Sequence, residues 1–169
     1  MELAEVHHKN MQIVPDPELH AYIEEIYSEF AIAQERVVLY LRQDVDLTFK
    51  TIRKSQTPFV EFIADLYTES MRADCSLINS GNFRIDKILP AGPVTFSALT
   101  SIIYDTVIVK ELTGKQILEA LENCVSMYPN LSGRFSGIAG VEFVWDCRKK
   151  PYERVVLETV KINDAAIDF

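Results

Sequence analysis

Hydrophobic and polar positions alternate along this chain with two different periods, one helical and one extended. The first clear helical pattern follows Val14-Pro15-Asp16-Pro17, where Asp16 can cap a helix and Pro17 suits its first turn. Apolar residues then recur at helical spacing, with glutamates on the other faces: Leu19, Tyr22, Ile23, Ile26, Tyr27 and Phe30. The pattern predicts a helix that begins at Pro17.

The next segment, 36–50, has the period of an extended chain. Residues 37–41 (VVLYL) read as a strand, and Val45, Leu47 and Phe49 alternate with polar residues. The alternation breaks at Thr51, which predicts a bulge or the end of the strand there.

Downstream, Thr57-Pro58 repeats the cap-and-proline signal and predicts a helix with a buried apolar face of Phe59, Phe62, Ile63, Leu66 and Tyr67. Strands are predicted at 76–79, 106–112, 141–145 and 154–162, and a long glycine-containing loop at 127–140. Thr95 and Thr113 are expected to cap two further helices. The pattern predicts a mixed α+β or α/β domain with a single core.

Composition and charge narrow the function classes. The chain has 169 residues, and 17 basic against 25 acidic residues give a net charge of −8. This charge argues against a nucleic-acid partner, which needs a basic surface. No apolar stretch is long enough to span a membrane and the N-terminus has no signal-peptide pattern. Three cysteines without CxxC spacing are expected to be free thiols, which mildly favours a reducing compartment and leaves the localisation unknown.

Residues that carry chemistry are scarce. All three histidines lie within the first twenty residues, with no metal-binding spacing. The chain has no nucleophile elbow, no phosphate-binding glycine loop and no recognisable nucleophilic cysteine. The sequence therefore predicts no catalytic residue and no metal ligand of its own.

The turn after the strand at 76–79 is the most suggestive feature. Asn79-Ser80-Gly81-Asn82-Phe83-Arg84 places a glycine beside amide groups and a guanidinium that can bind phosphate or carboxylate with two hydrogen bonds. The alternative is an ordinary asparagine-rich turn with an exposed arginine. Spacing alone leaves both interpretations open and favours the ordinary turn.

Read as a whole, the chain from about Thr51 to its end resembles the C-terminal domain of the 5′-nucleotidase family of metallophosphoesterases. The family's Leu-Ile-Asn-Gly-Gly-x-Ile-Arg segment corresponds to residues 77–84, and its Glu-x-Asn-x-Gly-Asn-x-Ile-x-Asp segment to residues 56–65. Residues 111–122, Tyr128-Pro129 and Gly133-Arg134-Phe135 also match in the same order. The resemblance implies an α+β domain over residues 15–169, with residues 1–14 as a linker from an upstream metallophosphoesterase domain.

In this family the C-terminal domain binds the substrate, and the N-terminal domain carries two divalent metal ions and the catalytic groups. The resemblance implies that Asn79 and Arg84 face the substrate, with Arg53 as a weaker candidate and Tyr104 as a candidate for stacking on the base. The implied partners are a nucleotide or related phosphate ester and the chain's own upstream domain. The isolated chain is expected to be inactive, so whether it belongs to an active enzyme stays open.

Several departures from the family pattern support a different interpretation. The family's Glu and Asn become Gln56 and Pro58, the second turn residue is Ser80, and the usual Pro-Gln after Gly-Arg-Phe is Ser136-Gly137. The resemblance also implies that a further strand and a Gly-Gly-Asp-Gly-Phe-like segment would follow, so the domain looks truncated at its C-terminal end. The alternative is a degenerate, non-catalytic domain used for packing or for forming a homodimer. The identity of the nucleotide or sugar nucleotide stays open.

Overall fold

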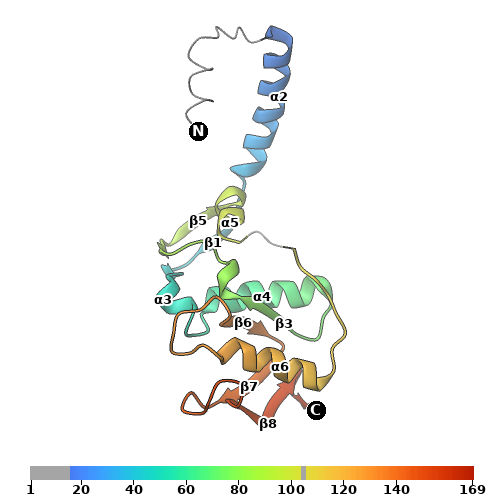
Figure 1. Cartoon of the computed structure of the whole chain (residues 1–169). Helices are drawn as coiled ribbons and strands as arrows, with labels where there is room; N and C mark the ends of the chain where they lie inside the picture. Colours follow the sequence, from blue (N-terminus) through green and yellow to red (C-terminus); the bar gives the residue numbers. More distant parts are fainter. Residues whose placement is uncertain (1–15, 104–105) are drawn as a thin grey trace, which may run out of the picture.

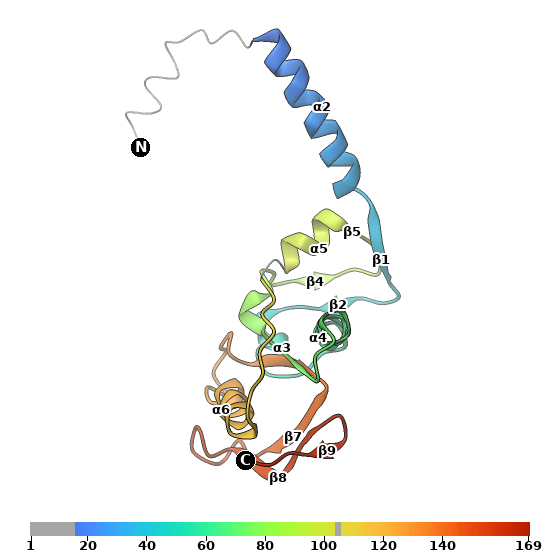
Figure 2. The ribbon, with the colours of Figure 1, turned by 90° about the vertical axis from the view of Figure 1, so that its right-hand side faces the viewer.

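The computed structural model describes residues 16–103 and 106–169. The proposed linker at 1–14 and the side chain of Tyr104 lie outside these ranges. Helix α2 (Pro17–Gln34) extends away from the rest of the molecule in both views of the ribbon (Figures 1 and 2). As predicted, Asp16 caps it, since the Asp16 carboxylate accepts hydrogen bonds from the amides of Glu18 and Leu19 at 2.9 and 3.1 Å.

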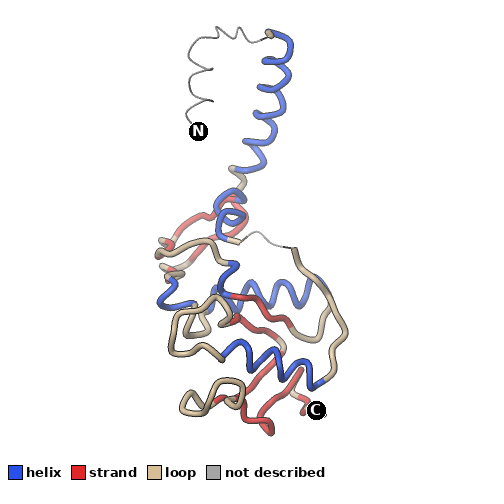
Figure 3. Tube along the Cα trace, in the orientation of Figure 1, coloured by secondary structure: helices blue, strands red, loops and turns tan. Residues whose placement is uncertain are grey.

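Below α2 lies a group of short strands and helices. Strand β1 (Val37–Leu41) pairs antiparallel with β5 (Gly92–Thr95), and β2 (Val45–Asp46) pairs with β4 (Ile88–Leu89). Helix α5 (Phe96–Ile102) follows β5, and Thr95 caps it as predicted, accepting from the Ala98 amide at 3.1 Å. The elements are shown by type in Figure 3.

A two-stranded sheet divides the core of the remaining body into two clusters. Strand β3 (Ser76–Asn79) pairs antiparallel with β6 (Ser136–Ala139). Ile78 and Ala139 join the cluster under α4 (Pro58–Met71), whereas Leu77 and Ile138 pack on the cluster under α6 (Gly114–Val125). Because neighbouring strand residues point to opposite faces, one sheet supplies both clusters. The single core predicted from the sequence therefore has two parts.

The C-terminal part is an antiparallel sheet packed on α6. Strand β7 (Val141–Trp145) pairs with β8 (Val155–Ile162), which pairs with β9 (Ala165–Ala166). Helix α6 begins as predicted at Thr113, which forms a capping box with Gln116. Its buried side chains include Ile117, Leu121 and Val125. The predicted mixture of helices and strands in one small domain is confirmed.

The predicted extended segment 36–50 is only partly correct. After β2 the chain forms a short helix, α3 (Phe49–Ile52), in place of a continued strand. The amide of Phe49, in the first turn of α3, donates to the Asp86 carboxylate at 2.7 Å. Asp46 accepts from the Thr48 amide at 2.8 Å and from the Thr51 hydroxyl at 2.7 Å. These carboxylates satisfy donors that a strand would have paired with a neighbouring strand.

Two further predictions about regular structure are wrong. Residues 106–112 belong to no strand of the described chain, and Ile108 and Val109 are exposed. Alternation alone does not supply a neighbouring strand with which to pair. The predicted loop 127–140 contains β6, where a side chain at Gly137 would come within 2.1 Å of the Val60 side chain. That glycine marks close packing of α4 on the sheet, not a turn.

The buried face of α4 also differs from the prediction. Phe59 and Ile63 are buried as expected, but Val60 and Ala64 complete the face. Phe62 and Leu66 are 44% and 39% exposed. The helix is rotated so that its small and β-branched residues meet β6, where glycine allows close approach.

Candidate functional site

The turn that follows β3 is held tightly against the segment before β6. Residues Ser80–Asn82 form a single 3-10 turn, η1. The Ser80 amide donates to the Phe135 carbonyl at 2.9 Å, and the Gly81 amide donates to the Gly133 carbonyl at 3.1 Å. A Cβ on Gly133 would lie 2.8 Å from the Gly81 Cα, which is too close for any side chain. The sequence predicted that the turn glycine allows a close approach. The structure shows one at Gly81, and the group that approaches it is the backbone of Gly133.

Asn79, at the end of β3, is exposed and belongs to a small hydrogen-bond network. The hydroxyl of Ser136 donates to the Asn79 side-chain oxygen at 3.4 Å and to the Arg134 carbonyl at 3.0 Å. The Gln56 side chain donates to the Ser136 carbonyl at 2.6 Å. Residues 56 and 79, far apart in the sequence, therefore meet at Ser136.

Burial of a neighbouring aromatic residue determines where Arg84 lies. Phe83 is fully buried and forms an isolated β-bridge with Ile103, while Arg84 is exposed. The Arg84 amide donates to the Ile102 carbonyl at 2.7 Å. The backbone of residues 83–84 is thus held by residues 102–103, while Arg84 itself is exposed.

Arg53 lies at the end of α3 and is half-buried. Its guanidinium carbon is 3.8 Å from the centre of the Phe49 ring, a cation–π contact. Its Nε is buried without a hydrogen-bond partner in the described chain. The Phe49–Asp86 hydrogen bond joins α3 to the segment that contains Arg84. Both arginines are thus carried by elements that contact each other.

Neither Arg53 nor Arg84 forms an ion pair with the carboxylate of Asp86, which joins their two segments. Within residues 16–103 and 106–169 the one ion pair joins Arg148 to Asp146, at 2.7 Å. The proposed stacking residue, Tyr104, lies outside the described residues.

Sequence reasoning treated Gln56 and Ser136 only as departures from the family pattern. The structure joins them in one hydrogen-bond network beside Asn79. The thiol of Cys124 also donates to the Ser136 hydroxyl, at 3.2 Å. Burial raises the pKa of the Cys124 thiol, more than the hydrogen bond with Ser136 lowers it. The available signal was that both departures fall in segments that match family motifs, at residues 56–65 and directly after Gly133-Arg134-Phe135.

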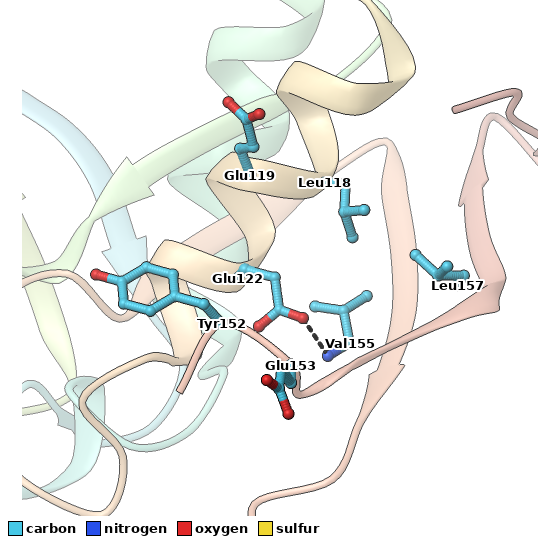
Figure 4. A pocket seen from close by; sticks show the side chains of 7 residues that line it. All are labelled: Leu118, Glu119, Glu122, Tyr152, Glu153, Val155 and Leu157. Carbon is cyan, nitrogen blue, oxygen red and sulfur yellow. Dashed lines mark hydrogen bonds between the residues drawn. The ribbon is translucent and has the colours of Figure 1, made fainter. Parts of the chain in front are cut away.

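Three cavities are hollowed elsewhere in the described chain. One of about 550 Å³ lies between α6 and β8 and is bordered by Glu119, Glu122 and Glu153 (Figure 4). A second of about 550 Å³, beside β6 and β7, has four carboxylates on its walls: Glu61, Asp65, Glu142 and Asp164. Their negative charge makes both unsuitable for a phosphate. The third, of about 800 Å³, lies where α2 meets α5.

None of these three cavities is lined by Arg53, Asn79 or Arg84. Over the described ranges, no three His, Cys, Asp or Glu side chains are grouped so as to hold a metal ion. The described residues therefore offer no ligand group for the metal pair that the resemblance assigns to an upstream domain. In the same ranges, no helix combines the length and apolar character needed to cross a bilayer.

Comparison with known proteins identifies the fold and its relatives. Residues 34–169 match the model of the 5′-nucleotidase C-terminal domain. Over 162 residues the chain is 29% identical to the trifunctional nucleotide phosphoesterase YfkN of Bacillus subtilis, covering 87% of the chain and 11% of YfkN. It therefore spans about a tenth of that relative.

Solved structures give the same result. A 5′-nucleotidase precursor from Thermus thermophilus has a TM-score of 0.69 at 26% identity, over 88% of this chain and 30% of that protein. The NAD nucleotidase of Haemophilus influenzae has a TM-score of 0.62 at 16% identity, over 91% of this chain and 30% of its own, and shares the fold. Since the family model spans most of the chain and these structures superpose on it, the chain belongs to the 5′-nucleotidase C-terminal domain family.

Proposed function

We propose that this chain is the substrate-binding domain of a 5′-nucleotidase-like phosphoesterase and that it holds a nucleotide at the turn after β3. The observation that carries the proposal is the rigid turn that leaves Asn79 and Arg84 exposed at its two ends. An arginine on a fixed backbone can offer its two-pronged guanidinium to an anion with little further loss of conformational freedom.

The electrostatic setting supports this position for an anion. The chain carries a net charge of −8, so its overall field repels a nucleotide. Arg84 and Arg53 have no ion-pair partner in the described chain, and they lie on segments joined by the Phe49–Asp86 hydrogen bond, so together they can offset that field locally. Hydrolysis itself would need metal ions held by another domain, because the described residues have no suitable group of ligands.

Nucleotide binding can be measured on the 169-residue chain by titration calorimetry with AMP as the probe. Loss of a charge-assisted hydrogen bond costs about 1.5–3 kcal/mol, so Arg84→Gln should weaken AMP binding about tenfold or more. Arg72→Gln is the matched control, because Arg72 is also an exposed arginine and lies at the C-terminal end of α4. Equal loss in both variants would mean that AMP responds only to overall charge.

The degenerate-domain alternative has one observation in its favour: the three cavities above all lie away from Arg53, Asn79 and Arg84. Under that alternative the wild-type chain would not bind AMP, and Arg84→Gln would change nothing. With divalent metal added, the isolated chain is expected to hydrolyse no nucleotide. Turnover that purified with the chain and disappeared in Arg84→Ala would contradict the assignment of chemistry to another domain.

A further inference from the structure

The pairing of β3 with β6 places two polar side chains against each other at the edge of the turn. Asn79 and Ser136 are directly opposite in the antiparallel register, so their side chains lie on the same face of the sheet. Asn79 is exposed, whereas Ser136 is only 3% exposed. The Ser136 hydroxyl donates to the Asn79 side-chain oxygen at 3.4 Å. A buried hydroxyl therefore contacts one end of the exposed carboxamide that the proposed function assigns to the nucleotide.

Ser136 is itself held by three further contacts. Its hydroxyl accepts from the Cys124 thiol at 3.2 Å and shares its proton with the Arg134 carbonyl at 3.0 Å, in a three-centre hydrogen bond. Its backbone carbonyl accepts from the Gln56 side chain at 2.6 Å. The Ser136 hydroxyl therefore has a fixed position, and an exposed side chain that bonds to it loses freedom of rotation.

The residues at positions 56 and 136 are two of the departures from the family pattern, and they fit each other. The side-chain amide of Gln56 has N–H groups, one of which it donates to the Ser136 carbonyl. An ionised glutamate at position 56 could only accept, so its oxygens would face an oxygen of the backbone. This fit between two departures favours a modified site over a decayed one.

The contact with Ser136 decides which end of the Asn79 carboxamide is left for a ligand. A carboxamide has an oxygen that accepts and an NH₂ group that donates, and the two point in different directions. Since the oxygen is turned toward the buried Ser136 hydroxyl, the NH₂ group is the end that remains available. Arg84, at the other end of the turn, can also only donate. Both ends of the turn therefore present donors, which suits the oxygen and ring-nitrogen acceptors of a nucleotide.

From these contacts we propose that Ser136 is a positioning residue, which turns the NH₂ group of Asn79 toward an acceptor atom of the bound nucleotide. The proposal rests on the proposed function, since it takes a nucleotide to bind at this turn. Ser136 is buried and acts through Asn79 without touching the ligand. Because Asn79 is held before the ligand arrives, less conformational freedom is lost on binding and the affinity is higher.

Titration calorimetry with AMP separates this role from a general effect on packing. Ser136→Ala should weaken AMP binding about three- to tenfold, because the ligand must then order the Asn79 side chain itself. In an Asn79→Ala background the same substitution should change the affinity less than about twofold, because the residue that it positions is gone. The matched control is Ser76→Ala, at the other end of β3, where the hydroxyl donates to the Ala64 carbonyl of α4 at 2.8 Å. This control should bind AMP as the wild type does.

A second measurement tests the positioning without any nucleotide. The heteronuclear NOE of the ¹⁵N-labelled Asn79 side-chain amide reports whether that NH₂ group is held on the nanosecond timescale. Its resonance is identified by its loss in Asn79→Ala. The amide should be ordered in the wild type and in Ser76→Ala, and mobile in Ser136→Ala. Unchanged backbone resonances away from β6 would establish that Ser136→Ala is folded.

The two measurements distinguish failure of the positioning role from failure of nucleotide binding. An Asn79 amide that is equally mobile in the wild type and in Ser136→Ala would overturn the positioning role, whether or not AMP binds. Equal losses of AMP affinity from Ser136→Ala in the wild-type and Asn79→Ala backgrounds would also overturn it, because Ser136 would then act only on the packing of β6. A wild type that does not bind AMP would refute the proposed function and the nucleotide as the partner of Asn79, and the amide measurement would still decide the role of Ser136.

Discussion

A buried carboxylate joins α6 to the start of β8, and its replacement gives the sharpest test of the packing. Glu122 is 7% exposed, and its two oxygens accept hydrogen bonds from the backbone amides of Arg154 and Val155 at 3.0 and 2.8 Å. The Arg154 guanidinium in turn donates to the carbonyls of Val125 and Ser126 at the end of α6. The charged side chains of Glu122 and Arg154 therefore hold α6 and the start of β8 together, each by hydrogen bonds to the backbone of the other element.

Glu122→Gln keeps the shape of the side chain but turns one acceptor into a donor. One backbone amide would then face an NH₂ group and lose its partner in a buried position. A hydrogen bond to a charged group contributes about 1.5–3 kcal/mol, so the expected loss of unfolding free energy is about 2 kcal/mol. At a urea dependence of about 2 kcal/mol/M, the unfolding midpoint should fall by about 1 M.

The assay is urea unfolding followed by the fluorescence of Trp145, which packs on the same core cluster and stacks edge-on with Tyr128 at 4.9 Å. Glu119→Gln is the control, since Glu119 lies one turn earlier on α6 and is exposed. The urea midpoint of this control should fall by less than about a quarter of the fall expected for Glu122→Gln. Equal midpoints for the two variants would refute the reasoning that the Glu122 carboxylate holds β8 to the helix.

Three further outcomes follow from the structure. Gly133→Ala should both destabilise the chain and weaken AMP binding, because its Cβ would meet backbone at Gly81, 2.8 Å away; unchanged AMP affinity in a folded variant would contradict the role of the turn. Cys147, which is exposed, should react with a thiol reagent at pH 8 much faster than Cys124, whose pKa burial raises; comparable rates would contradict this. The pKa of Asp46 is lowered by its hydrogen bonds, so its contribution is present above about pH 4 and is lost as pH falls through the folded-state pKa. The stability gap between wild type and Asp46→Asn should therefore be present at pH 7 and close as pH falls through the folded-state pKa of Asp46; urea midpoints that keep the gap in acid would show that the carboxylate charge is not its source.

Most signals that act over a few residues were correctly identified in the sequence, although Thr57 stands at the N-cap of α4 without a capping hydrogen bond from its side chain. Asp16, Thr95 and Thr113 each cap a helix through hydrogen bonds to amides two or three residues away. The strands at 76–79 and 141–145 formed where they were predicted. The family, too, was apparent from the order of its motifs, because many local matches in one order are specific.

The candidate site could be predicted only in outline. The positions of Asn79 and Arg84 on a glycine turn follow from the sequence, but the contact of that turn with Gly133 does not. The same holds for the link from Gln56 to Asn79 through Ser136, which spans many residues. Their assignment as nucleotide-binding residues remains a prediction for the calorimetry described above.

The sequence by itself determined the long helices and where they begin, the strands at 37–41, 76–79 and 141–145, and the family, since these depend on neighbouring residues. Only the tertiary structure decided that Phe49 opens a helix, because its amide is bound by Asp86, and that residues 136–139 are a strand. It also decided that the apolar face of α2 stays exposed in the described chain. A pattern of apolar residues determines which face seeks a partner, but only the arrangement of distant elements determines whether one is there.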